Sequence, residues 1–218
     1  MKIMKAVIIG ATGATGIELV NNLLERTWIS EVKVLVRSPK LKEHQKLKQV
    51  VVDFNQLEKY EDEIKGDLAF SCLGTTLKDA GSKKNQWVID HDYQCRFAQI
   101  AKDNDIPIFV LLSAIGANSN SFIFYNKMKG QIENDIKALD FNRLIIVRPS
   151  LLIRKGMERK NEKLGRNFIH AMNSIGLMKS KRPLDVKVVA NAMAESVDST
   201  VDRFKVVEVD DIIELNKL

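Results

Sequence analysis

The sequence predicts an α/β fold, in which a doubly wound, mainly parallel sheet of about seven strands carries helices on both faces and a small C-terminal helical cap. Two observations predict this fold. Short apolar, β-branched runs alternate along the chain with longer amphipathic stretches, which is the order of βαβ units. These runs are almost continuously apolar, as strands are when helices cover both faces of a parallel sheet.

The elements follow in order from these patterns. The predicted strands are the apolar runs Met4–Ile9, Val32–Val36, Gln49–Asp53, Leu68–Leu73, Ile108–Leu112, Leu144–Val147 and Phe204–Val209. The predicted helices repeat apolar residues at helical spacing and cover Ile17–Glu25, Gln94–Asp103, Phe124–Leu139 and Val186–Val197. No repeat or linker interrupts this order, so residues 1–218 are expected to form one domain, with residues 151–182 as a small cap.

Composition excludes several classes of protein. With 45% hydrophobic residues and a net charge of +6, the chain of 218 residues is not disordered. Two cysteines, Cys72 and Cys95, cannot build a disulfide scaffold, so both are interpreted as core thiols of a protein in the reducing cytoplasm. No run of about 18 apolar residues predicts a membrane span. The apolar run near the start stops at Gly10, too early for an export signal.

The basic surplus, with an isoelectric point near 9.2, is interpreted as a lysine-rich solvated surface rather than a nucleic-acid interface. It is densest from Arg154 to Arg182, where nine Lys and Arg residues face only two acids, Glu158 and Glu162. An anionic substrate or partner is expected to bind there. Nucleic-acid binding by this stretch is kept as the weakest hypothesis, and it predicts an affinity that falls steeply with salt.

A glycine-rich turn follows the first predicted strand and opens the first helix. It consists of Gly10, Ala11, Thr12, Gly13, Ala14, Thr15 and Gly16. Glycine allows a tight turn and a close approach of the backbone, while the start of the helix offers free N–H groups and a positive dipole end. The two threonines add hydroxyl donors. The turn therefore predicts a Rossmann-type site for the pyrophosphate of a dinucleotide.

The end of the second strand indicates which dinucleotide binds. An acid there would bind the ribose 2′-hydroxyl of NAD, but this chain has Arg37 followed by Ser38, with Lys40 nearby. A guanidinium group binds phosphate in a bidentate manner, so the sequence predicts NADP in preference to NAD.

The third and fourth strand ends supply further candidates for cofactor binding. Asp53 and Phe54 are expected to flank the adenine, and the backbone of Leu73, Gly74 and Thr75 is expected to lie beside the ribose. Ligands of such sheets bind at the carboxyl ends of the strands, where all these residues lie.

The candidate catalytic group is Ser113, Tyr125 and Lys129. Ser113 ends the fifth strand, and Tyr125 and Lys129 are four residues apart on one helix face. Reduction of a carbonyl by hydride needs a proton donor, and a tyrosine with a pKa near 10 needs a nearby cation to serve at neutral pH. Lys129 would provide that cation, and Ser113 would hold the substrate oxygen.

Together these segments resemble an atypical short-chain dehydrogenase/reductase of the Tat-interacting-protein-like, NAD(P)-binding branch, whose bacterial relatives are often labelled sugar-epimerase-like. The matching segments are Gly10–Gly16, Val36–Ser38, Asp53–Phe54, Ser71–Thr76, Asp92–Tyr93, Leu112–Ala114, Phe124–Gly130 and Arg148–Leu152. The resemblance implies NADPH binding in the crevice, with Ser113, Tyr125 and Lys129 as the catalytic group; Tyr125 and Lys129 would also contact the cofactor.

Some residues depart from the family pattern. Arg96 stands where extended relatives carry an asparagine of the proton relay, and Ser150 stands where many members have glycine. The chain has no large C-terminal substrate domain, which argues against epimerisation of a nucleotide sugar.

Two main functions follow from the sequence. The first is an NADPH-dependent oxidoreductase acting on a small carbonyl or alcohol, and the second is a non-catalytic NADPH sensor that acts through a protein partner. Trp28 and Trp87 are interpreted as packing residues. No metal site is expected, because no two of the three histidines, His44, His91 and His170, have ligand spacing.

Overall fold

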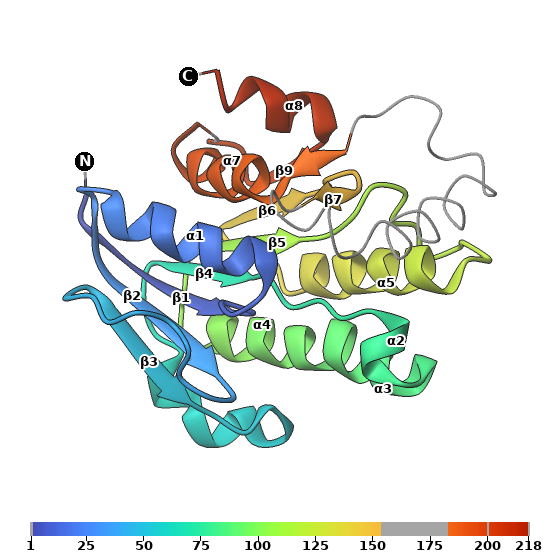
Figure 1. Cartoon of the computed structure of the whole chain (residues 1–218), viewed down its shortest axis with the longest axis horizontal. Coiled ribbons are helices and arrows are strands. Elements are labelled where there is room, and N and C mark those ends of the chain that lie inside the picture. Colours follow the sequence, from blue (N-terminus) through green and yellow to red (C-terminus); the bar gives the residue numbers. More distant parts are fainter. Residues whose placement is uncertain (1, 154–182, 200, 218) are drawn as a thin grey trace.

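Seven parallel strands form the central sheet in the order β3-β2-β1-β4-β5-β6-β9 (Figure 1). The computed structural model describes residues 2–153, 183–199 and 201–217. The strands are β1 Met4–Ile9, β2 Ile29–Val36, β3 Leu47–Val51, β4 Leu68–Ser71, β5 Ile108–Leu112, β6 Arg143–Val147 and β9 Phe204–Val207. A separate pair joins β7 Leu152–Ile153 to β8 Leu184–Asp185. The predicted doubly wound sheet is confirmed, and its order reverses between β1 and β4.

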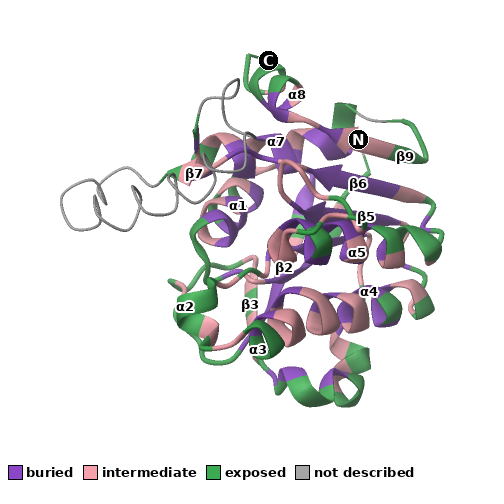
Figure 2. Ribbon diagram, turned by 90° about the vertical axis from the view of Figure 1, so that its right-hand side faces the viewer, coloured by how far each residue is buried: buried purple, intermediate pink, exposed green. Residues whose placement is uncertain are grey.

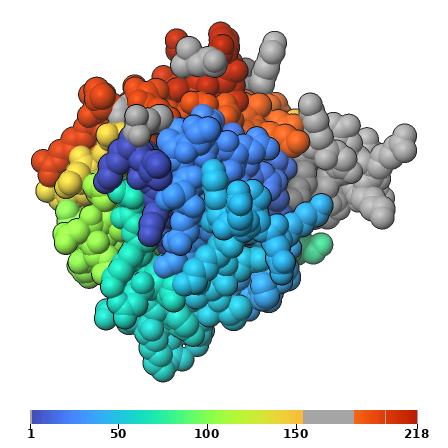
Figure 3. Space-filling model, turned by 90° about the vertical axis from the view of Figure 1, so that its left-hand side faces the viewer, coloured from blue at the N-terminus to red at the C-terminus, as the bar shows by residue number. Residues whose placement is uncertain are grey.

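Helices cover both faces of this sheet. They are α1 Ala14–Glu25, α2 Leu77–Ala80, α3 Lys83–Trp87, α4 Tyr93–Asp103, α5 Phe124–Ala138, α7 Val186–Ser199 and α8 Val209–Glu214, with the 3-10 segment η1 Phe54–Glu63 and the π-helix η2 Val88–Asp92. In Figure 1, α1 and α7 lie on one side of the sheet and α4 and α5 on the other. Figure 3 shows the C-terminal segment directly against the N-terminal one, in agreement with the contact of α7 with α1.

The inner strands β1, β2, β4, β5 and β6 are largely buried on both faces, as Figure 2 shows, whereas the edge strands β3 and β9 are mostly half-buried or exposed. Because successive side chains of a strand point to opposite faces, neighbouring residues enter different halves of the core. In β1, Ile8 packs with the apolar residues of α1 and α7, while Val7 and Ile9 pack with those of α4 and α5. This double burial explains why the strands read as continuous apolar runs.

Several element bounds differ from the predicted ones. The strand predicted to run to Val209 stops two residues earlier, because Glu208 forms a capping box with Asp211 and starts α8. The largest difference precedes α4: the chain is already helical from Lys83 through α3 and η2. The π-turn adds one residue to the helix, so apolar residues before and after it do not share the regular helical spacing of three or four residues. A pattern based on that spacing therefore does not predict this part of the helix.

Three residues interpreted as structural lie in or against the core. Trp28 is buried in the core, as expected of a packing residue, and Cys72 is a buried thiol. Cys95 is a partly buried free thiol that packs against the edge of the core. Most of the predicted cap, including the basic stretch Arg154–Arg182, lies outside the described residues. Within the described ranges, no helix is long and apolar enough to cross a membrane.

Candidate functional site

The predicted site residues come together at the carboxyl edge of the sheet, beside the point where the strand order reverses. The glycine loop connects β1 to α1, residues 73–75 follow β4, and Ser113 follows β5. Tyr125 and Lys129 lie in the first half of α5. This edge is where open α/β sheets bind their ligands.

The two ends of the loop, Gly10 and Gly16, have no room for a side chain, so only glycine fits there. Gly10 has a φ of +77°, and a Cβ there would stand 2.3 Å from the carbonyl carbon of Cys72. A Cβ on Gly16 would stand 2.1 Å from the carbonyl oxygen of Gly10. These close approaches seat the loop on the end of β4 and bring the start of α1 to the sheet edge.

The middle of the loop is the part that a ligand can reach. Residues 12–14 are exposed, whereas Thr15 is buried. No side chain of the described residues caps the N-terminus of α1, whose N-cap residue is Gly13. The N-terminus of this 12-residue helix is therefore open to an anion, as the predicted pyrophosphate site requires.

Arg37 directly follows β2, at the same edge of the sheet as the glycine loop. The parallel register pairs Ile9 with Leu35, so Gly10 and Arg37 follow adjacent strands at the same edge. Arg37 is exposed, and it makes no ion pair with any residue in the described part of the chain. Its guanidinium group is therefore available to a phosphate.

Asp53 and Phe54 have structural contacts of their own. The Asp53 carboxylate caps η1 by accepting from the backbone N–H of Asn55 and from the Gln56 amide, both at 2.9 Å. These hydrogen bonds lower the pKa of Asp53. Phe54 is buried, with its ring centre 5.6 Å from that of Tyr93. Contact of these two residues with an adenine stays a prediction.

Three residues spaced four apart form a polar stripe on α5: Tyr125, Lys129 and Glu133. The Lys129 ammonium nitrogen lies 6.0 Å from the centre of the Tyr125 ring, and Lys129 is only 3% exposed. Burial lowers the pKa of Lys129, although the charges of Asp90 and Glu133 act to raise it. Burial, with a contribution from Asp90, raises the pKa of Tyr125 well above its usual value.

Ser113 joins this stripe through Glu133. The Ser113 hydroxyl donates a hydrogen bond to the Glu133 carboxylate. Arg148 holds the same carboxylate with its Nε at 3.0 Å from Oε1, and it reaches Glu208 at 3.1 Å. Because the hydroxyl hydrogen is engaged with Glu133, the Ser113 oxygen is left as a hydrogen-bond acceptor. The sequence motifs include Ser113 and Arg148, but they did not point to Glu133, the buried acid that contacts both.

Asp90 is a second site residue that sequence reasoning missed. It is 1% exposed, and its Oδ1 accepts from the backbone N–H of Thr75 at 2.7 Å. Its Oδ2 is buried and has no hydrogen-bond partner within the described residues. Burial raises the pKa of Asp90, while the charge of Lys129 acts to lower it. Asp90 thus interacts electrostatically with both Lys129 and Tyr125.

The π-helix explains how Asp90 reaches this place. The Asp90 carbonyl accepts from the Gln94 side chain at 2.6 Å, and the Gln94 oxygen accepts from the Ser71 hydroxyl at 2.6 Å. These two bonds tie η2 to the end of β4. Arg96 lies elsewhere: its guanidinium group binds Glu58 at 2.9 Å and carbonyl groups of η1. Asp90, and not Arg96, is therefore the polar residue that this helix contributes to the site.

Comparisons with known proteins agree with the fold and the glycine loop. The NAD(P)H-binding family model matches residues 10–199. Protein FMP52, mitochondrial, of Eremothecium gossypii is 36% identical over 152 residues, which are 69% of this chain and 67% of that protein. Protein HTATIP2 of Rattus norvegicus is 35% identical over 171 residues, which are 76% of this chain and 70% of that protein.

A solved structure shares the fold. The short-chain dehydrogenase/reductase superfamily protein of Agrobacterium tumefaciens with bound NAD has a TM-score of 0.70 at 12% identity, covering 94% of this chain and 77% of that one.

One expectation is overturned by these comparisons. Three fungal relatives are named mitochondrial, which contradicts the cytoplasmic location expected from the cysteine content and the absence of an export signal. Those two observations bear on secretion and do not separate the cytoplasm from other reducing compartments. The family itself is clear: the chain belongs to the NAD(P)H-binding family and is an atypical short-chain dehydrogenase/reductase of the Tat-interacting-protein-like branch.

Proposed function

We propose that this protein is an NADPH-dependent oxidoreductase that transfers hydride to or from a small carbonyl or alcohol, with Tyr125 as general acid/base. The observation that carries the proposal is the approach of the buried Lys129 to the half-buried Tyr125 at the sheet edge where the glycine loop opens. Asp90 adds a buried charge beside both residues. Groups whose pKa values are shifted by burial and by specific partners are typical of functional sites.

The residues present fit a dinucleotide. The exposed loop at residues 12–14 and the open N-terminus of α1 would hold the pyrophosphate. Arg37 would bind a 2′-phosphate, and Gly74, where a Cβ would meet nothing within 4 Å, leaves room for a ribose. When bound, the nicotinamide supplies or accepts the hydride.

The shifted pKa values favour the reductive direction. The raised pKa keeps Tyr125 protonated at neutral pH, so its hydroxyl is ready to donate a proton to a substrate oxygen. The phenolate that remains is stabilised by the ammonium group of Lys129, and Asp90 helps Lys129 to keep its charge. The Ser113 oxygen would accept a hydrogen bond from the alcohol product, because its own hydrogen is donated to Glu133.

The substrate class is proposed to be small and anionic. The basic stretch Arg154–Arg182 follows β7, in the part of the sequence proposed as the cap over the site. Its excess of positive charge would attract an anionic carbonyl compound and raise its rate of association.

The first experiment is calorimetric titration with NADPH and, separately, NADH. Micromolar binding of NADPH, at least about tenfold tighter than that of NADH, is the expected result, since each tenfold step corresponds to about 1.4 kcal/mol. Binding of neither dinucleotide would overturn both the enzyme and the sensor.

The second experiment tests the role of Tyr125 on a panel of carbonyl substrates. Tyr125→Phe should lower kcat by about a hundredfold or more, because it removes the proton donor, and should leave NADPH affinity within a few-fold. Tyr60→Phe, which removes a hydroxyl from η1, is the matched control and should keep full turnover. Equal turnover by wild type and Tyr125→Phe would refute the assigned role. Tight NADPH binding without any turnover by wild type would favour the sensor instead.

A further inference from the structure

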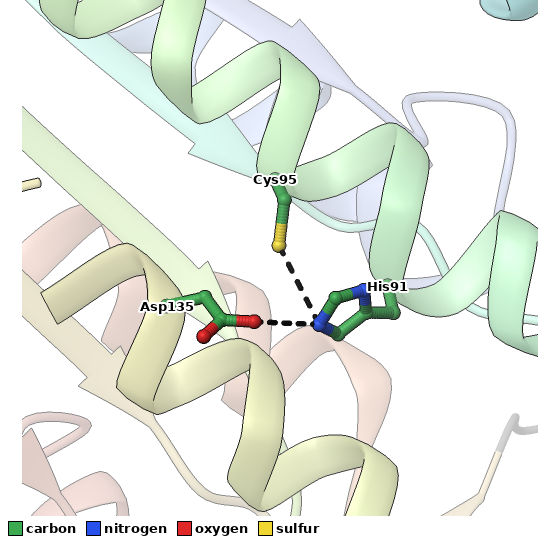
Figure 4. Close-up of side chains that lie close together, drawn as sticks. All are labelled: His91, Cys95 and Asp135. Atoms are coloured by element: carbon green, nitrogen blue, oxygen red, sulfur yellow. Dashed lines mark hydrogen bonds and ion pairs between the residues drawn. The ribbon is translucent and has the colours of Figure 1, made fainter. Parts of the chain in front are cut away.

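A second cluster of polar side chains lies between the helices α4 and α5. It consists of His91 from η2, Cys95 from α4 and Asp135 from α5, and Figure 4 shows the three side chains converging. The His91 Nε2 lies 2.8 Å from Asp135 Oδ2 and 3.8 Å from Cys95 Sγ. All three potential ligand atoms lie within 4.8 Å of one another.

We propose that this cluster binds a zinc ion. Ligand atoms around tetrahedral zinc, with bonds of about 2.0–2.3 Å, stand roughly 3.3–3.6 Å apart. The distances of 2.8 and 3.8 Å from His91 Nε2 bracket this range. One imidazole, one thiol and one carboxylate suit zinc, whereas Mg²⁺ and Ca²⁺ prefer sets of oxygen ligands. Three protein ligands leave the fourth position to water.

The surroundings of the cluster match those of a built metal site. His91 Nδ1 lies 2.8 Å from Asp92 Oδ1, and a ring N–H donated there leaves Nε2 as the free ligand nitrogen. The other oxygen of Asp135 accepts from the Gln131 amide at 2.9 Å. The ring of Trp87 stacks on the imidazole with a centroid distance of 4.7 Å. Such outer contacts fix the orientation of metal ligands.

The two carboxylates on either side of His91 give the strongest argument for a cation. A neutral imidazole carries a single N–H and can donate to Asp92 or to Asp135 but not to both, whereas a protonated ring donates to both. A cation between Nε2 and Asp135 satisfies both groups at once. The Asp135 side chain is 42% exposed, which leaves a route for the ion from solvent.

A nucleophilic cysteine explains the cluster less well. Cys95 is only partly exposed, and its sulfur lies 3.8 Å from His91 Nε2, beyond the distance of a strong hydrogen bond to a general base. In addition, His91 Nε2 lies 1 Å closer to Asp135 than to the sulfur, so the imidazole is not poised to take the thiol proton.

The ion would connect two helices that serve the proposed catalytic site. Its ligands come from the continuous helix that carries Asp90 and from α5, which carries Lys129. The zinc site is separate from the dinucleotide site, because none of its ligands belongs to the residues assigned to cofactor or substrate. It can therefore be tested without either.

Cobalt(II) is the probe of choice, because a thiolate bound to cobalt gives a charge-transfer absorption. The full chain, freed of metal with a chelator, is titrated with Co²⁺ and then with Zn²⁺. We expect one Co²⁺ per chain with a thiolate charge-transfer band, which Zn²⁺ bleaches and Mg²⁺ does not. Cys95→Ala should abolish the band, and Cys72→Ala, which removes the other cysteine, should retain it. Asp92→Asn should keep the band but weaken zinc affinity by about 10- to 100-fold.

Two outcomes would overturn the zinc site. One is the absence of a thiolate band in the wild-type chain, and the other is a band that persists in Cys95→Ala. Circular dichroism of each variant checks that it folds. If Cys95→Ala fails to fold, the partly exposed ligand provides the second variant: Asp135→Asn must weaken zinc binding at least about tenfold, and unchanged binding would overturn the proposal.

Discussion

Gly130 offers the sharpest test of how α5 is positioned. It lies directly after Lys129, in a segment typical of this family branch, and its lack of a side chain lets another backbone segment cross the helix. A Cβ at this position would stand 2.1 Å from the backbone nitrogen of Ser119 and 2.3 Å from the carbonyl carbon of Asn118. The crossing segment is held there by a hydrogen bond of 2.9 Å from the Asn118 N–H to the Asn126 carbonyl.

Two opposing effects decide the outcome of Gly130→Ala. Alanine in a helix interior is favoured over glycine by about 1 kcal/mol. Overpacking costs about 1–3 kcal/mol, and the upper end applies here because the obstructing atoms are backbone and cannot rotate away. The net result is a loss of about 2 kcal/mol in the free energy of unfolding. For a chain of this size, that loss lowers Tm by about 4–8 °C.

Thermal unfolding followed by circular dichroism measures this shift. Gly74→Ala is the matched control, since a Cβ there meets nothing within 4 Å and the free energy of unfolding should change by less than about 0.5 kcal/mol. A Gly130→Ala protein that melts at or above the temperature of the wild type would refute the close crossing.

Three further predictions concern the charged groups of the site. Arg37→Ala should weaken NADPH binding by about 10- to 150-fold, the equivalent of a charged hydrogen bond, and leave NADH binding within a few-fold; calorimetry checks both. Asp90→Asn removes a charge that raises the pKa of Lys129, so Lys129 should lose its proton at lower pH. The alkaline limb of the pH profile of kcat/KM for carbonyl reduction should therefore move to lower pH, and an unmoved limb would contradict this coupling. Glu133→Gln removes the buried acid of an ion pair whose partner, Arg148, is partly exposed, and should cost about 3 kcal/mol, or about 6–12 °C in Tm, by thermal unfolding.

The sequence predicted those features that depend on local pattern. Continuous apolar runs mark strands buried on two faces, and the glycines at positions 10 and 16 mark a turn that only glycine can make. The fold and the dinucleotide loop follow from these local signals. Tyr125 and Lys129 were found for the same reason, because four-residue spacing on a helix is visible without a structure.

The features that it missed depend on tertiary contacts. Glu133 is an acid on a helix that would be solvated on most surfaces, and only folding places it between Ser113 and Arg148. Asp90 was not predicted as a site residue because the π-turn interrupts the regular spacing by which helices are recognised in a sequence. The approach of Asp135 to His91 depends on the packing of α5 against η2, which no spacing within a single segment encodes.

Because of the π-helix η2, both proposed sites depend on the number of residues in this segment. Its wide turn holds one residue more than a regular α-helix would, and the helix continues without a break from Lys83 to Asp103. Deleting a single residue from η2 would restore regular winding inside the turn and leave α3 and α4 nearly in register, because the wide turn already accommodates the extra residue. Asp90 and His91 both lie inside this turn, so the deletion would turn Asp90 away from the catalytic edge and His91 away from Asp135 in the same event. Substitutions can alter the two sites one at a time, but a change of length in this turn alters both together.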